Sequence, residues 1–388
     1  MRFAWLAAAA CTASALVALG CGDNLGVPDA HAHADANHGS DATGSDGTVP
    51  PDANLGPATV QDTGLCSDPG CATIADDVNE YAPQFTLFAD GASKRRWFRL
   101  PTGTQIDSSD MDHWVFPVGT QFWKEFTDEN GTRIETRYMT KLLADDEAPK
   151  AWFYVSYAWN ATEDVNTAVP AGVMNANGTT HDIPSRQQCK SCHENLKPSR
   201  VLGFGAISLD FKQTSNGLLD LDDVITKGLL TVNPPGAAAP HYKLPGTAAE
   251  KAALGYLHAN CGHCHNSTST IVTNNESPIQ LRLDTLHLAT TAVTPTYTTS
   301  VGVNGHVVVP TDADCPTAPA VPCTAIPPCP GTAAGLGSCL VDPGDLVGST
   351  LLFRFIATNH SLHMPALGTK TTDPVGKTTL TTWISGLH

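Results

Sequence analysis

The chain has 388 residues, with 22 basic and 38 acidic side chains, a formal net charge of −16 and an isoelectric point near 5.2. This acidity argues against nucleic acid or an anionic surface as a partner, and fits either ordinary solubility or attraction of a basic partner protein. Its 12 cysteines are consistent with an oxidising compartment.

The N-terminus has the pattern of an export signal over residues 1–20. Met1 and Arg2 precede an apolar run over residues 3–19, as in secretory signals, and the run is marginal in length for a membrane span. Cys21 follows a stretch that resembles a bacterial lipobox. We therefore expect export to the periplasm or the outer membrane and cell surface, with a lipid anchor on Cys21. Simple cleavage to a soluble secreted product is the alternative.

Residues 21–64 are rich in Asp, Ala, Gly, His and Pro and contain almost no large apolar side chains. Such a segment cannot bury enough apolar surface to offset the entropy of ordering, which predicts a flexible tether. Directly after it, Cys66 and Cys71 bracket the turn sequence Ser-Asp-Pro-Gly, which a small disulfide would close.

Residues 65–182 are expected to form a β-rich domain. Short runs rich in aromatic and β-branched residues are separated by turn residues; they lie at 96–100, 114–116, 121–126, 133–143 and 151–159. Runs at this spacing predict a small antiparallel sheet or sandwich. We expect their aromatic side chains to fill the core of the sheet rather than to form a ligand-binding face.

Two pentapeptides of the form C-x-x-C-H follow in the second half of the chain. Their defining residues are Cys189, Cys192 and His193 in motif 1, and Cys261, Cys264 and His265 in motif 2. This is the attachment signature of a c-type haem, in which the thiols bond to the haem and the histidine ligates the iron. The sequence therefore predicts two covalent haem c groups, with both histidines as proximal ligands.

The alternatives are a structural zinc site and a thioredoxin-like redox pair. The two cysteine pairs lie 72 residues apart (261 minus 189), more than the roughly 15–20 residues typical of a zinc ribbon. A zinc site would also leave the histidine after each pair unexplained. A redox C-x-x-C is expected near a βαβ pattern in a cytosolic protein, and the sequence has no such pattern.

Helical patterning dominates after residue 183. Residues 218–230 have amphipathic spacing, Thr247 and Glu250 have the spacing of a capping box, and residues 345–356 and 376–387 predict two further helices. We expect an α+β fold, with the β-rich domain followed by a mainly α-helical, cytochrome c-like diheme region. Residues 183–247 are expected to form the first haem c region and residues 248–388 a second haem c domain with a loop insertion.

Each haem iron has a second axial position. Met364 lies in a loop before the last helix, where c-type domains carry a distal methionine, whose thioether raises the potential. No methionine lies between the two motifs, so the distal ligand of the first haem stays open. The candidates in this chain are His241, His258, Met174 and His181. An unliganded sixth position is a further alternative.

The insertion covers about residues 311–341 and is rich in Pro, Ala, Gly and Thr. It carries four cysteines, which are Cys315, Cys323, Cys329 and Cys339. Four cysteines allow three pairings, and the sequence does not choose among them. We expect disulfides here to staple a surface loop.

Several strings occur in a specific order along residues 82–388. They include Phe-Thr-Leu-Phe-Ala-Asp at 85–90, Phe-Pro-Val-Gly-Thr at 116–120, Ile-Pro-Ser-Arg-Gln-Gln-Cys at 183–189, Tyr-Leu-His-Ala-Asn-Cys at 256–261, Pro-Gly-Asp at 343–345 and Met-Pro at 364–365. In this the chain resembles a bacterial family of exported diheme c-type cytochromes with a β-rich leading region. The resemblance implies electron transfer with redox proteins of the periplasm or cell envelope, and it defines no substrate. The chain departs from the pattern at 311–341.

Two classes of function therefore compete. In the first, the protein carries electrons between redox partners through its two haems. In the second, it is a diheme peroxidase or oxidase, with one open iron and acid or base groups around it. The motif spacing favours the carrier, because diheme peroxidases space their motifs more widely, whereas the missing local distal ligand favours the enzyme. A β-rich binding module is a third alternative.

Overall fold

The computed structural model describes residues 56–194, 201–215, 217–274, 277–304, 339–358 and 362–388. All of them belong to one compact unit of the chain. The expected signal, Cys21, most of the expected tether and most of the 311–341 stretch lie outside the described residues, as do Cys315, Cys323 and Cys329. No helix in the described part is long and apolar enough to cross a bilayer.

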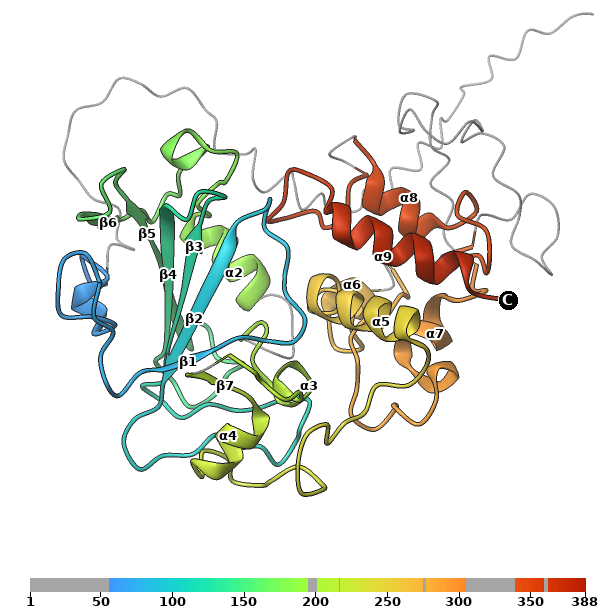
Figure 1. Ribbon diagram of the computed structural model, residues 1–388, viewed down its shortest axis with the longest axis horizontal. Coiled ribbons are helices and arrows are strands. Elements are labelled where there is room, and N and C mark those ends of the chain that lie inside the picture. The colour runs from blue at the N-terminus through green and yellow to red at the C-terminus, as the bar shows by residue number, and fades with distance from the viewer. Residues whose placement is uncertain (1–55, 195–200, 216, 275–276, 305–338, 359–361) are drawn as a thin grey trace, which may run out of the picture. The chain divides into compact units, whose positions relative to one another are not determined.

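The strands of the described chain form a seven-stranded sheet in the order β6-β5-β4-β3-β2-β1-β7 (Figure 1). Neighbouring strands are antiparallel except β1 and β7, which are parallel. The bounds are β1 Asn79–Tyr81, β2 Ser93–Arg99, β3 Gln121–Thr127, β4 Arg133–Lys141, β5 Trp152–Trp159, β6 Asn166–Ala168 and β7 Leu218–Leu219. Strands β2 to β5 correspond to four of the predicted runs. The fifth run, 114–116, contributes only an isolated bridge from Val115 to Asp107.

One face of the sheet, here the outer face, packs against the chain that precedes β1. Trp97, Trp123 and Tyr138 lie in register across β2, β3 and β4 on this face, and all three are buried. They belong to one apolar cluster with Val60 and Leu65. Because Val60 is fully buried, the folded part of the chain begins before residue 65, inside the segment expected to be a tether.

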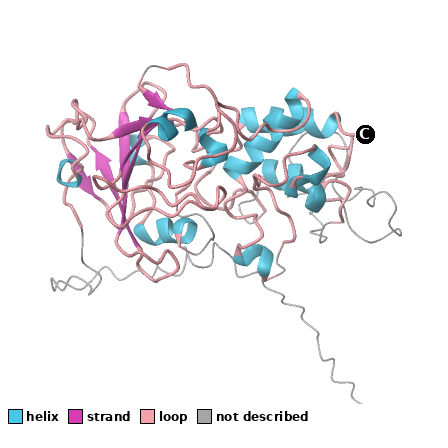
Figure 2. Ribbon diagram, turned by 90° about the horizontal axis from the view of Figure 1, so that it is seen from below, coloured by secondary structure: helices cyan, strands magenta, loops and turns pink. Residues whose placement is uncertain are grey.

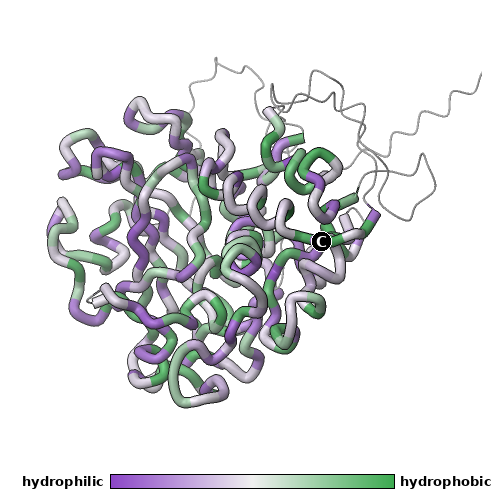
Figure 3. Tube along the Cα trace, turned by 45° about the vertical axis from the view of Figure 1, so that its right-hand side comes forward, coloured by the Kyte–Doolittle hydropathy of each residue, from purple (hydrophilic) through white to green (hydrophobic). Residues whose placement is uncertain are grey.

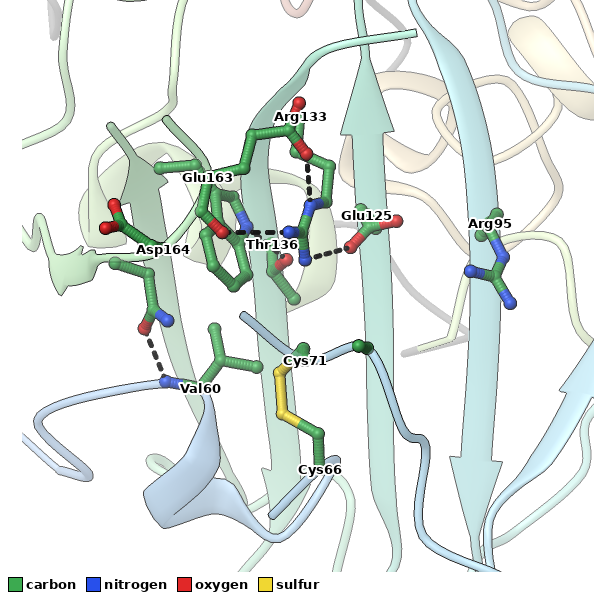
Figure 4. Close-up of polar contacts among 12 residues, drawn as sticks. Val60, Cys66, Cys71, Arg95, Glu125, Arg133, Thr136, Glu163 and Asp164 are labelled. Carbon is green, nitrogen blue, oxygen red and sulfur yellow. Dashed lines mark hydrogen bonds and ion pairs between the residues drawn. A yellow bond between two sulfur atoms is a disulfide. The ribbon is translucent and has the colours of Figure 1, made fainter. Parts of the chain in front are cut away.

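Polar and covalent links hold this outer face together. Cys66 and Cys71 form the predicted disulfide. Near it, Arg133 of β4 pairs with Glu163 at 2.8 Å and with Glu125 at 3.7 Å (Figure 4). In a different part of the chain, at the end of the expected 311–341 insertion, Cys339 is also disulfide-bonded.

The opposite face, here the inner face, packs against residues that follow motif 1. Phe98, Phe122 and Met139 lie in register across β2, β3 and β4 and share an apolar cluster with Phe204 and Leu221. The ring of Phe204 lies 4.7 Å from that of Phe98 and 5.3 Å from that of Phe122, between centroids. The inner face is therefore covered by the region that was expected to form the first haem domain.

The helices are short and separated by long loops (Figure 2). Their bounds are α2 Arg186–His193, α3 Ala206–Leu209, α4 Leu221–Thr226, α5 Ala248–Asn260, α6 Thr270–Thr273, α7 Pro295–Ser300, α8 Thr350–Ile356 and α9 Pro374–Ser385, with 3₁₀ turns η1 Gln61–Thr63, η2 Ala176–Gly178 and η3 Thr291–Val293. Helices α5, α8 and α9 share one apolar cluster around Leu257, Phe355 and Trp383. A Cβ on Gly376 of α9 would lie 2.2 Å from the Tyr256 ring of α5, so these two helices approach closely.

The prediction of a mainly α-helical, cytochrome c-like region is wrong. In the described residues only α5 and α9 are longer than eight residues, and the largest element is the mixed sheet. Along the described chain, hydrophobic and hydrophilic positions alternate over short stretches (Figure 3). The region from 183 to 247 also supplies a strand, β7, to the sheet.

The physical reason lies in how residues 218–230 bury their apolar side chains. Leu218 and Leu219 pair with β1 as strand β7. Asp220 then starts α4 through a capping box with Asp223, and the helix ends at Thr226. The leucine spacing that resembles one amphipathic helix therefore serves a strand and a helix of two turns, because both pack on the sheet. Tertiary burial outweighs local periodicity here.

Asn260, the last residue of α5, ties this helix to the segment before β2. Its side-chain oxygen accepts a hydrogen bond from the backbone N–H of Phe88 at 2.7 Å, and its amide nitrogen donates to the carbonyl of Thr86 at 3.1 Å. Close by, a Cβ on Gly255 would lie 2.2 Å from the Phe85 ring. Helix α5 is thus fixed against the sheet-forming part of the chain one residue before motif 2.

Candidate functional site

Motif 1 occupies the last five residues of α2. The helix starts at a capping box, in which Ser185 and Gln188 bond reciprocally. Cys189, Cys192 and His193 are three and four positions apart, so the two thiols and the imidazole lie on neighbouring positions of the helix surface. The His193 ring lies 5.3 Å from the Tyr154 ring of β5, between centroids. Motif 1 is therefore attached to the sheet.

Motif 2 continues the last turn of α5. The predicted capping box of Thr247 and Glu250 starts this helix. After its end, the backbone N–H groups of Cys264 and His265 both donate to the carbonyl of Cys261, at 3.1 and 2.9 Å. This turn gives motif 2 the same three- and four-residue spacing that motif 1 has in α2.

Two residues without metal-binding groups fix the turn of motif 2. A Cβ on Gly262 would lie 2.7 Å from the Arg282 Cα and 2.8 Å from the His258 carbonyl oxygen, so glycine is required there. The Asn266 amide nitrogen donates to the carbonyls of Gly262 and His263, both at 3.0 Å. The backbone of the motif is thus held on both sides.

The two motifs lie beside each other, although they are far apart in sequence. Burial raises the pKa of the Cys264 thiol, and the charge of Cys192 raises it further. Burial, with a smaller contribution from the charge of His193, likewise lowers the pKa of His263 to about 4. Electrostatic effects of this kind act over short distances in a protein. One thiol and one imidazole of each motif therefore share an environment.

All four motif cysteines are free thiols, in contrast to Cys66 and Cys71. Burial raises the pKa of Cys189 to about 11 and that of Cys261 to about 12. A zinc site would need deprotonated thiolates. Within the described residues, no three His, Cys, Asp or Glu side chains converge as metal ligands would.

Basic side chains of the inner face lie beside both motifs. Arg96, Lys124 and Arg137 stand in register across β2, β3 and β4. The charge of Arg137 acts to lower the pKa values of Cys189 and Cys192, and that of Lys124 acts to lower the pKa of His263, although burial is the larger cause in each case. Motif 1 is therefore within range of the positive charge of Arg137, and motif 2 of that of Lys124.

Met364 and His265 have a neighbour in common. The backbone N–H of Met364 donates to the carbonyl of Arg354 in α8 at 2.9 Å. Burial lowers the pKa of His265 to about 4, and the charge of Arg354 contributes to this lowering. Arg354 thus links the loop of Met364 with the electrostatic surroundings of motif 2, and ligation of iron by Met364 stays a prediction.

The rings of the two histidine candidates for the first haem are engaged in hydrogen bonds. His258 Nδ1 accepts from the Leu283 N–H at 3.0 Å, and burial lowers its pKa to about 3, so Nε2 carries the proton of a neutral ring. His241 faces the Pro235 carbonyl at 2.7 Å and the Asp222 carboxylate at 3.0 Å. Against the effect of burial, these acceptors raise its pKa. In these geometries neither ring presents a lone pair to iron.

The two remaining candidates for the distal ligand of the first haem are Met174 and His181. Met174 is 70% exposed, and His181 is buried with Nε2 2.7 Å from a Glu135 carboxylate oxygen. His263 is a residue that sequence reasoning missed, because its position beside His193 depends on tertiary structure. His263, His258 and Arg282 line a cavity of about 70 Å³. This is far below the roughly 300–1,000 Å³ of typical ligand pockets.

No family model, no curated protein and no solved structure matches the chain. The chemistry of the site therefore rests on its own residues and their geometry.

Replacing Gly262 by Ala tests the close packing of motif 2. The added Cβ would meet two backbone atoms that cannot move independently, so we expect a loss of about 1–3 kcal/mol in the free energy of unfolding. Urea unfolding measures this loss. Gly205→Ala is the control, because Gly205 has an extended backbone and no atom lies within 4 Å of the added Cβ. Equal stability of the two variants would contradict the packing.

Proposed function

We propose that the chain is an exported diheme c-type cytochrome that carries electrons between redox partners of the cell envelope. The observation that carries the proposal is the pair of C-x-x-C-H motifs, each with both thiols free, which lie within range of each other's charges. The haem supplies one-electron chemistry at its iron. Side-by-side attachment would make electron exchange between the two groups short-range.

The four cysteines and two histidines fit this cofactor. Each thiol adds across one vinyl group, with sulfur bonding to one carbon and the thiol hydrogen passing to the other, so no oxidant is consumed. His193 and His265 act as proximal ligands through the nitrogen of the neutral ring. The low pKa of His265, caused mainly by burial, favours that neutral form.

For the second haem, Met364 is the proposed distal ligand. Its loop is held to Arg354, whose charge also acts on His265. A thioether in this position raises the potential of the second haem. The first haem differs, because both ring nitrogens of His241 and the Nδ1 atom of His258, the two histidine candidates for its distal position, are engaged elsewhere.

This difference keeps a diheme peroxidase or oxidase as the second candidate function. An enzyme of that class needs an iron with an open sixth position and nearby proton-transfer groups. The buried Glu135, whose carboxylate contacts His181, lies on the same strand, β4, as Arg137, whose charge acts on motif 1. Carbon monoxide binding to the reduced protein distinguishes an open iron from a closed one.

Export and anchoring complete the proposal. Residues 1–20 direct export, and acylation of Cys21 anchors the protein to a membrane. The redox partners are in the periplasm or at the cell surface. Stable anchoring needs more than one acyl chain. The net charge of −16 disfavours nucleic acid as a partner and favours a basic redox protein.

The haem content of the exported protein tests the proposed function directly. We expect haem staining to survive denaturing gel electrophoresis, at two haems per chain, because thioether bonds resist denaturation. Replacing Cys261 and Cys264 by Ala should leave one haem. Replacing Cys66 and Cys71 by Ala is the matched control and should leave two, because that pair forms a disulfide. Purified protein with zinc and no covalent haem would exclude the proposal.

Met364→His tests the distal ligand of the second haem. Imidazole in place of the thioether should lower the potential of one haem and abolish the weak near-infrared absorbance of a sulfur–ferric bond. A redox titration followed by optical spectroscopy measures both effects. Met174→His is the control, because Met174 is mostly exposed and should leave both waves in place. If neither wave moves in Met364→His, Met364 is not a ligand.

A further inference from the structure

Four basic side chains gather on the inner face of the sheet. Lys94 and Arg96 project from β2, Lys124 from β3 and Arg137 from β4. Arg96, Lys124 and Arg137 are direct cross-strand neighbours, and Lys94 is two residues from Arg96 on the same face. We name these four residues the basic row. Like charges placed directly opposite one another in a sheet are destabilising.

The basic row is poorly compensated within the described residues. Arg137 pairs with the Glu135 carboxylate at 2.5 Å, and that carboxylate is shared with His181. Arg96 is only 4% exposed, and in the described part of the chain no ion pair to a carboxylate is formed by Lys94, Arg96 or Lys124.

Carboxylates at longer range do not balance this charge. Asp90 and Asp373 act on Lys94, and Glu135 acts on Lys124. Even so, burial, together with Arg96, Arg137 and Lys94, lowers the pKa of Lys124 well below its ordinary value. A protein that keeps several cations in such surroundings needs an anion to offset their desolvation.

The position of the basic row identifies the chemistry of that anion. Cys189 of motif 1 packs against the apolar cluster of the same inner face, and the His193 ring lies 5.3 Å from the Tyr154 ring of β5, between centroids. A haem attached to motif 1 brings two propionate carboxylates, which are the kind of anion that Arg and Lys bind through charge-assisted hydrogen bonds. On the basis of the proposed function, we propose that the basic row binds haem propionates.

This arrangement gives the sheet a role in setting the haem potentials. A propionate carries negative charge close to the iron and favours the ferric state, whereas a cation paired with that propionate offsets the charge. Losing one cation of the basic row should therefore lower the potential of the nearest haem. The thioether bonds do not depend on the propionates, so both haems stay attached when the basic row is altered.

The test measures midpoint potentials of the full-length, haem-loaded protein carrying Lys124→Met. We expect one haem to become about tenfold harder to reduce, a fall of about 59 mV for a one-electron couple. Lys124→Arg should retain the wild-type potentials, because it keeps the cation. The matched control is Arg95→Met, which removes the same charge from β2 on the outer face, where Arg95 pairs with Glu80, and it should leave both potentials unchanged.

The outcomes separate this inference from the proposed function. Absence of covalent haem overturns the proposed function. If both proteins carry two covalent haems and each haem has the same potential in Lys124→Met as in wild type, only the propionate assignment is overturned. A wild-type potential that shifts when inorganic phosphate is added at constant ionic strength overturns it too, because the basic row would then be holding an exchangeable anion. If Lys124→Met does not fold, Lys124→Gln replaces it, with the same expected fall.

Discussion

The hydrogen bonds of Asn260 are the interaction on which the rest of this site depends. They fix the end of α5 to residues 86–88, directly before β2, and Cys261 is the next residue. On the other side, α2 attaches motif 1 to β5 through Arg186, whose Nε donates to the Tyr154 carbonyl at 2.9 Å. Both motifs are thereby held to the same sheet, which explains how segments 72 residues apart come to share one environment.

Local features of the sequence predicted much of the architecture around the site. Alternating aromatic residues indicated β2 to β5, because such side chains fill both faces of a sheet. The capping box at Thr247 and the disulfide between Cys66 and Cys71 could also be predicted, since each depends on residues close together in the chain. The prediction of one helix over 218–230 was wrong for the opposite reason. Its leucines are buried against the sheet, which is distant in sequence, and the local spacing of apolar residues does not show that contact.

The electrostatic character of the site was beyond sequence reasoning. Arg96, Lys124 and Arg137 lie in three different strands, and only the register of β2, β3 and β4 makes them neighbours. The same holds for His263 and His193, whose proximity links the two motifs. The chain thus combines an acidic total charge with a row of basic side chains on the inner face of its sheet. In the proposed electron carrier, the acidic charge would attract a basic partner while the basic side chains would accommodate the anionic groups of the haem.

The central claim is that the motifs hold two haems side by side. Electron paramagnetic resonance of the fully oxidised and the half-reduced protein tests it most directly, because nearby ferric irons interact magnetically. The account predicts that the signal of one haem changes in shape or relaxation when the other is reduced. A fully oxidised spectrum equal to the sum of two independent ferric signals, unchanged on half-reduction except for the loss of one, would contradict it.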